Sequence, residues 1–372
     1  MQFRALSFLV VSTLSTHLYA QDLNFDSVLS DELLPTGRQV VIAETRIGSG
    51  TTYFNNQSQE QPLFSALSNL SLATDLLIPL LGTTQLSSKL SGQRVNFTYG
   101  YGLSENLTAG FIVGWGKLTN QVSFSVIGAG SPAADAFSAA TVQSALTSNY
   151  GYKPITTAVT EGILDPQIGV RWRVAKSEKS STIIVPAIRI GMATYDDSDN
   201  LMDVHLTDGS SALMLAAEQR YRLRVAELRA YVQYTLPLAD KFQARPYAAG
   251  GSPLVAQAAT ETLDRKVGGM WKMELEGAKR WNNWRAMARM EYSRTATTHY
   301  TSHSGQAVSG LEMNTEGWDV VVRTGVSWNR FSDYLAKQSG LPVMLAVEYS
   351  SMLDGRNVPQ SDNVYLTATL PF

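Results

Sequence analysis

The stretch Trp318-Asp319-Val320-Val321-Val322-Arg323-Thr324-Gly325-Val326-Ser327-Trp328 decides the fold class of this chain. One face carries valines, a threonine and the two terminal tryptophans, and the other carries Asp319 and Arg323, so the alternation predicts a β-strand. At about 3.3 Å per residue the tryptophans lie roughly 33 Å apart. A tilt of roughly 40° projects this length to about 25 Å, the height of the apolar band of an outer-membrane barrel. Taken alone, the stretch also fits a soluble β-sandwich.

Similar alternating segments recur along the whole chain. They lie near residues 39–47, 94–103, 107–116, 168–175, 184–192, 213–222, 227–236, 271–276, 284–292, 343–349 and 364–372. With the first stretch they make about twelve strands, the even number that single-chain bacterial barrels have, and ten or fourteen are the alternatives. We therefore predict an all-β fold, a transmembrane antiparallel up-and-down β-barrel, as a single domain over residues 21–372.

The links between these segments alternate in length. The short ones are residues 104–106, 177–180, 223–226 and 282–283, and the link at 330–340 is longer than these. The long ones are near residues 55–92, 121–163, 195–210, 238–267, 300–314 and 352–361. Outer-membrane barrels have short periplasmic turns and long extracellular loops, so the alternation predicts this class and assigns the long links to the outside.

The N-terminus and the composition agree with an exported membrane protein. Arg4, the apolar run from Ala5 to Leu14, and Leu18-Tyr19-Ala20 predict a signal peptide over residues 1–20. The chain has no cysteine, which excludes disulfides and thiolate metal sites. Its net charge of −2 has no basic excess that would point to nucleic acid. Residues 63–81 are too polar for a membrane helix, and a closed barrel is the other fold that satisfies its backbone in lipid.

The inward faces of the predicted strands collect charged side chains, which would cost a few kcal/mol each if they faced lipid. The predicted lumen-lining residues are Arg171, Arg173, Glu218, Arg220, Arg222, Glu227, Arg229, Glu274, Glu276, Arg285, Arg289, Glu291, Asp319 and Arg323. They predict either a wet pore that favours anionic or polar solutes, or a salt-bridged network that fills a narrow barrel. Trp318, Trp328, Tyr349 and Phe372 are the predicted membrane-interface aromatics.

The long links carry further candidates. Leucines and Phe64 within residues 63–77 approximate a helical spacing, and residues 133–146 could form a second short helix. Such apolar loops could capture a greasy ligand, or pack as a lid. Aspartates crowd residues 196–208, but their spacing is no EF-hand, and we expect no metal and no cofactor. His303-Ser304-Gly305 resembles the His/Ser pairs of barrel-embedded lipid hydrolases, yet lies in a predicted loop without an oriented base, so we expect no enzyme.

Three motifs resemble known patterns. The terminal Tyr365-Leu366-Thr367-Ala368-Thr369-Leu370-Pro371-Phe372 resembles the C-terminal signal of bacterial outer-membrane proteins, and Tyr101-Gly102-Leu103-Ser104-Glu105-Asn106-Leu107-Thr108-Ala109-Gly110 looks like their strand-turn-strand signature. Residues 162–173, Gly-Ile-Leu-Asp-Pro-Gln-Ile-Gly-Val-Arg-Trp-Arg, are similar to a segment of the outer-membrane family linked to the meta-pathway of phenol degradation, with Leu164 where that family has glycine.

The resemblance implies a channel in the outer membrane of Gram-negative bacteria for passive passage of small molecules, possible substrates being hydrophobic or aromatic compounds. The implied partners are outer-membrane lipid, a small-molecule solute and, through the C-terminal strand, the barrel-assembly machinery. Two alternatives stay open. One is a structural or adhesive barrel with an occluded lumen, and the other is a lipid-modifying barrel enzyme.

Overall fold

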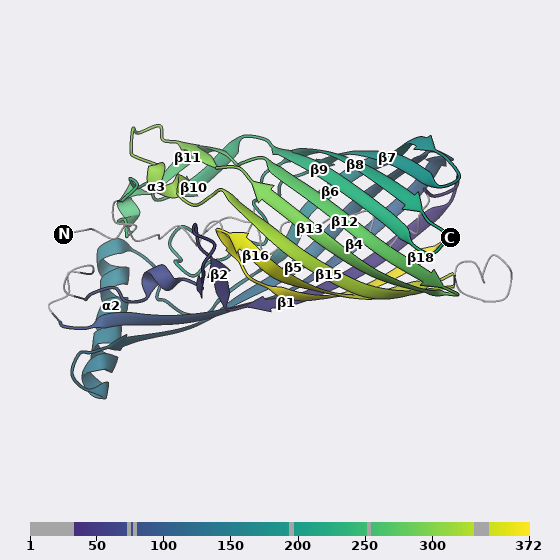
Figure 1. The fold of residues 1–372 in the computed structure, drawn as a ribbon. Helices are drawn as coiled ribbons and strands as arrows, with labels where there is room; N and C mark the ends of the chain where they lie inside the picture. Colours follow the sequence, from purple (N-terminus) through teal and green to yellow (C-terminus); the bar gives the residue numbers. More distant parts are fainter. Residues whose placement is uncertain (1–32, 73–75, 77–79, 193–196, 251–253, 331–341) are drawn as a thin grey trace.

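Twelve strands form one closed antiparallel barrel (Figure 1). The computed structural model describes residues 33–72, 76, 80–192, 197–250, 254–330 and 342–372, so the predicted signal peptide and most of the link at 330–340 lie outside the described residues. The barrel strands are β1 (Gln39–Gly50), β4 (Thr83–Ser104), β5 (Leu107–Ile127), β6 (Ala158–Lys176), β7 (Ser180–Arg189), β8 (Ala212–Arg222), β9 (Glu227–Pro237), β12 (Met270–Trp281), β13 (Trp284–Thr295), β15 (Gly317–Asn329), β16 (Met344–Arg356) and β18 (Asp362–Pro371).

The predicted fold class and strand number are confirmed. Each strand pairs with its neighbours in the chain, and β1 closes the barrel against β18. At the seam the Gln39 N–H donates to the Phe372 carbonyl (2.8 Å) and the Phe372 N–H donates back (2.9 Å). No helix in the described part of the chain is long and apolar enough to cross a membrane.

The remaining elements gather at one end of the barrel (Figure 1). Two small sheets form from β17 (Val358–Pro359), β2 (Thr52–Phe54) and β3 (Glu60–Pro62), and from β10 (Asp240–Ala244), β11 (Glu261–Lys266) and β14 (His299–Thr301). The helices are η1 (Ser65–Leu67), α2 (Pro132–Tyr150), η2 (Gln257–Ala259) and α3 (Ser309–Glu312). We call this end the loop end, and the opposite end, with the four short links and the C-terminus, the turn end.

Alternation decides which side chains face out of the barrel. On β12 the side chains of Trp271, Met273 and Leu275 are exposed, whereas Lys272 and Glu274 between them are buried. The outward face of the wall is therefore apolar and the inward face charged, as a barrel in lipid requires. Trp284 and Trp328 pair at the turn end and Phe372 lies there too, while Trp318 lies at the loop end of β15. Tyr349 lies midway along β16, opposite Thr324, rather than near a strand end.

Three strands extend farthest beyond the sequence prediction. β4 and β5 stay paired out to Thr83 and Ile127, although residues 83–92 and 121–127 were expected to be loop. β6 likewise begins at Ala158. The expectation was wrong because it followed an outward apolar face, and beyond Gln93 that face turns polar, with Lys89 and Gln121 exposed. The strands continue past the membrane band, where water solvates their outer face.

The inner face of this extension is apolar and carries a core of its own, which we call the lid core. It buries side chains from β4, β5, α2 and the loops, including Leu63, Phe64, Leu72, Leu86, Leu90, Leu118, Val126, Val142, Leu146, Tyr152, Met202 and Leu206. The predicted helix at 133–146 is confirmed as α2. In the described part of residues 63–77 only the turn η1 forms, because Phe64 and Asn69 adopt positive φ (56° and 64°), which ends a helix.

The motif at residues 162–173 forms a bulge in β6. The register with β5 shifts between Ile112 and Gly114, so that Asp165 and Pro166 have no partner on β5. Asp165 is buried, accepts a hydrogen bond from the Met192 N–H (2.9 Å), and lies 4.0 Å from the guanidinium of Arg189. The bulge turns Leu164 inward, so this leucine joins the lid core.

Candidate functional site

A continuous network of charges lines one wall of the lumen, on β6, β8, β9 and β12. Glu218 is its first centre: the carboxylate lies 3.5 Å from Arg171 and 3.2 Å from Arg229, and it also pairs with Arg220. The side chain of Glu218 is fully buried. Because Arg171 and Arg229 are buried too, removing Glu218 would take a shared counter-ion from three cations inside the wall.

Glu274 is the second centre and extends the network to β13. Arg229 donates to it (2.7 Å), Lys272 lies at 2.9 Å, and Arg289 at 3.7 Å. Arg289 also donates to Glu276 (2.9 Å) and lies 3.4 Å from Glu291. Acidic and basic residues alternate around this wall, so most of its charge is compensated locally.

A second group adjoins this network on the next strands round the barrel, β15, β16, β18 and β1. Arg323 of β15 pairs with Glu348 of β16 and stacks on the ring of Tyr365, 3.6 Å from its centroid. Arg46 of β1 lies 5.3 Å from the same ring and donates to the Asn363 side chain (3.1 Å). Tyr365 therefore links two arginines that are far apart in the sequence.

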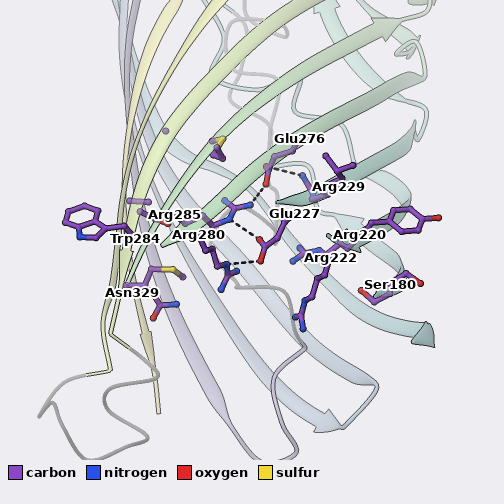
Figure 2. A pocket seen from close by; sticks show the side chains of 18 of the residues that line it. Ser180, Arg220, Arg222, Glu227, Arg229, Glu276, Arg280, Trp284, Arg285 and Asn329 are labelled. Atoms are coloured by element: carbon purple, nitrogen blue, oxygen red, sulfur yellow. Dashed lines mark hydrogen bonds and ion pairs between the residues drawn. The ribbon is translucent and has the colours of Figure 1, made fainter. Parts of the chain in front are cut away.

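The lumen opens at the turn end into a cavity, which we call the vestibule (Figure 2). Its charged lining is Arg173, Lys176, Lys179, Arg220, Arg222, Arg229, Arg280 and Arg285, with Glu178, Glu227, Glu276 and Glu348. Eight basic side chains thus face four acidic ones. Arg280 lies 2.9 Å and Arg285 3.4 Å from Glu227, as the dashed lines in Figure 2 show. The lining holds four more basic than acidic side chains, although Arg220 and Arg229 also pair with Glu218 and Glu274 deeper in the wall.

Ten of the predicted lumen-lining residues are buried in the barrel, and the other four line the vestibule. The buried ones are Arg171, Arg173, Glu218, Arg229, Glu274, Glu276, Arg289, Glu291, Asp319 and Arg323. The vestibule residues are Arg220, Arg222, Glu227 and Arg285. The structure brings residues of β6, β8, β9, β12 and β13 into one network, and Arg323 lies beside it on β15, directly opposite Arg289 of β13. Alternation also places Tyr231 and Tyr365 on the inner face, but the predicted lining set held charged residues alone and left both tyrosines out.

The loop end is closed by side chains of the lid core and by an arginine. Arg245 is buried and donates to the carbonyls of Tyr150 and Val255 (2.7 Å each) and to the Asp199 carboxylate (2.6 Å). Its guanidinium lies 3.8 Å from the ring centroid of Tyr152. One side chain therefore ties together the loops that follow α2, β7 and β10, and we call it the loop latch.

The candidate His/Ser pair lies outside the barrel wall. The Ser304 hydroxyl donates to Glu261 (2.7 Å), and His303 lies 3.2 Å from Asp264. Hydrogen bonds from Ser304 and Ser302 hold the pKa of the Glu261 carboxyl at about 2, so Glu261 anchors the loop as a carboxylate acceptor. Within the described residues no group of three or more His, Asp or Glu side chains could hold a metal ion.

Comparisons with known proteins support the fold. No family model matches the sequence, and neither does any curated protein. A solved outer membrane channel from Pseudomonas putida F1 is similar over 92% of this chain and 97% of that chain, with TM-score 0.57 and 10% identity. The translocator domain of autotransporter NalP from Neisseria meningitidis covers 91% and 90% (TM-score 0.45, 12% identity), and the Ralstonia pickettii toluene transporter TbuX covers 91% and 90% (TM-score 0.42, 10% identity).

Proposed function

We propose that this protein is an outer-membrane channel for passive passage of small organic anions that carry an apolar part, such as aromatic carboxylates. The turn end would face the periplasm and the loop end the outside, because outer-membrane barrels have short periplasmic turns and long outer loops. The observation that carries the proposal is the vestibule, where eight basic side chains line the lumen with four acidic ones.

The charge of the vestibule supports the anionic half of this substrate class. A cavity lined by an excess of one sign of charge, with low-dielectric walls, raises the local concentration of ions of the opposite sign. The arginines also present planar donor groups that match a carboxylate. Small anions would therefore be favoured over cations of the same size.

The lid core supports the apolar half. A solute that enters from the loop end would have to pass between the leucine-rich side chains of the lid core, which are packed against one another. Apolar groups would partition there, because burial stabilises them by about 25 cal/mol per Å² of apolar surface removed from water. The structural resemblance to the Pseudomonas putida F1 channel concerns the fold, and the substrate class rests on the residues of this chain.

The test is conductance and solute flux of the refolded protein. In planar bilayers with a KCl gradient we expect a reversal potential of the sign for chloride preference. In liposome swelling we expect benzoate to enter faster than benzylamine, a cation of similar size. The matched pair Arg280→Gln and Lys279→Gln sharpens this test, because the two residues are adjacent on β12 and only Arg280 lines the vestibule.

Arg280→Gln should lower the chloride preference and Lys279→Gln should leave it unchanged. Equal permeation by benzoate and benzylamine would contradict the substrate class.

The dense pairing inside the lumen favours a second candidate, a structural barrel whose lumen is filled. Glu218 and Glu274 each meet three cations, so the wall network can stand without a solute. An absence of current in the wild type and in an Arg245→Gln variant with loosened loops would support this candidate against the channel.

A further inference from the structure

The described chain begins inside the barrel. Leu33 and Leu34 are 5% and 7% exposed, and they precede β1, which starts at the turn end. Between them and β1 the chain makes a turn in which the Arg38 N–H donates to the Pro35 carbonyl (3.0 Å) and Gly37 has φ 77°. The segment therefore folds back from the turn end into the lumen. We call residues 33–35 the strap.

The strap touches two walls of the barrel at once. Leu33 packs in an apolar patch of Ile183 and Val185 (β7), Ala216 (β8) and Tyr231 (β9), which we call the Leu33 seat. Leu34 packs against Val40 and Ile42 of β1, with Met344 beside them. In the closed order of twelve strands, β8 lies five strands from β1 in one direction and seven in the other. Two consecutive residues thus span the lumen between nearly opposite walls.

Specific contacts fasten the strap to β4 and β5. The Leu34 N–H donates to the buried hydroxyl of Thr108 (3.1 Å), and the N–H groups of Gly37 and Gly102 exchange hydrogen bonds with the carbonyls of Gly102 and Arg38 (2.8 and 2.9 Å). A Cβ on Gly102 would lie 2.1 Å from the Pro35 carbonyl oxygen and 2.6 Å from that of Leu34. β4 therefore carries glycine at the point where the strap crosses it.

The strap lies at the edge of the vestibule. Met344 borders Leu34 and also lines the vestibule. Arg229 lines the vestibule as well, and its guanidinium lies 4.9 Å from the ring of Tyr231 in the Leu33 seat. A solute on its way through the lumen to the vestibule must pass between these two walls, where the strap now lies.

We propose that the strap is an internal stopper, which closes the lumen beside the vestibule when Leu33 occupies its seat and opens the channel when Leu33 leaves. This inference rests on the proposed channel function and adds a closure device at the turn end, distinct from the lid core at the loop end. The four side chains of the Leu33 seat are uncharged, so releasing Leu33 from them breaks no ion pair and costs less than opening the charged wall.

The first test changes only Leu33. Leu33→Ala should raise the mean conductance several-fold, because the smaller side chain leaves the seat partly empty. Leu33→Ile, which keeps the apolar volume, should conduct like the wild type. If Leu33→Ala and Leu33→Ile conduct alike, the strap is no stopper.

The second test locks the stopper, and the absence of cysteine from the chain makes it clean. In the double variant Leu33→Cys with Val185→Cys, the two thiols are the only ones, and they replace side chains of one packed cluster. The oxidised protein should pass several-fold less current than the same protein after reduction. The single variants, treated with the same oxidant, should show no such difference.

The outcomes separate this inference from the proposed function. If the double variant conducts equally well when reduced and when oxidised, the strap is no stopper, and the channel function still stands. Where the folded double variant forms no disulfide, the conductances of Leu33→Ala and Leu33→Ile decide the outcome. If Leu33→Ala and the reduced pair both pass no current, the channel and the stopper fall together.

Discussion

The two halves of the β4–β5 ribbon follow opposite rules. In the half within the barrel, Phe97 and Phe111 point outward and are exposed, while Arg94 and Asn96 point inward and are buried. In the half that extends beyond the barrel, Lys89 is exposed on the outer side and Leu86 and Leu90 are buried on the inner side. The period of two is the same in both halves. In the extension the outer face meets water instead of lipid, and the inner face meets the lid core instead of the charged lumen. The pattern of one strand pair therefore records where the membrane ends.

This difference extends to what fills the space inside. Within the barrel the inner face is charged, and its charges pair with one another across β6, β8, β9, β12 and β13. At the loop end the inner face is apolar, and loops and α2 pack on it as in a small soluble domain. If the two regions differ in this way, substitutions in the charged wall and in the lid core should affect different parts of the molecule.

Glu274→Ala should have the largest effect on stability. It leaves Arg229, Lys272 and Arg289 inside the wall without their shared carboxylate, and breaking a buried ion pair costs about 3–5 kcal/mol. Glu161→Ala is the matched control, since Glu161 pairs with Lys117 on the exposed surface (3.1 Å), where such pairs contribute about 0–1 kcal/mol. Urea unfolding of the refolded barrel measures both. Equal losses would mean that the lumen network is solvated like the surface.

Leu146→Ala should loosen the lid core and spare the barrel. Leu146 of α2 is 3% exposed, and truncating a buried leucine costs about 2–5 kcal/mol. Phe137→Ala on the exposed side of the same helix should be nearly neutral. Limited proteolysis of the loops, read beside the heat-dependent gel shift of the barrel, separates the two parts. If the variant lost both the gel shift and the protection of its loops from protease, the barrel and the lid core would not fold independently.

Arg245→Gln should release the loops with a smaller loss. The change removes the hydrogen bonds that the charged guanidinium donates to Tyr150, Val255 and Asp199. A hydrogen bond of a charged group contributes about 1.5–3 kcal/mol. Hydrogen exchange should rise in residues 150–155 and 197–203 and stay unchanged in β12. Lys241→Gln, on the exposed face of β10, is the charge-matched control. Unchanged exchange in both variants would show that apolar packing alone holds the loops.

Low pH should weaken the contact between Arg245 and Asp199 in the loop latch. Partial burial alone would raise the pKa of Asp199, but the hydrogen bond and charge of Arg245 lower it overall. Since the folded-state pKa lies below the unfolded value of about 3.9, this tie contributes at neutral pH and is lost as pH falls through the lower folded value. Loop proteolysis should therefore be flat from about pH 8 to 5 and rise in stronger acid. Asp199→Asn should remove that acid-dependent rise.

Much of the barrel could be predicted because each strand carries its own signal. Trp318 to Trp328 fixes a strand, its two faces and its length without reference to any other residue. The inward charges of β8 and β12 were placed on the lumen side by alternation alone. The partners were not predictable, because Glu218 meets Arg171 and Arg229 only through the register of β6, β8 and β9, and many registers satisfy the same alternation.

The limits of the strands and the N-terminal segment were beyond sequence reasoning. The extension of β4 and β5 depends on a lid core assembled from residues more than a hundred positions apart, such as Leu90 of β4 and Met202 of the loop after β7. The strap depends on Gly102 leaving room for the Pro35 carbonyl, which no periodicity reports. Gly100 and Gly102 were the available signal, since glycines on an inner face mark a close approach.

Alternation along the chain was enough to predict a closed barrel of about twelve strands, the face that each strand turns to lipid, and the charged side chains that lie inside. These follow from a local rule, that a strand alternates its faces and each face must suit its surroundings. The pairing of the charges, the packing of the loops over the loop end and the place of Leu33 in its seat on β7, β8 and β9 came from the three-dimensional structure. These depend on residues that are distant in the chain and meet only when the barrel closes.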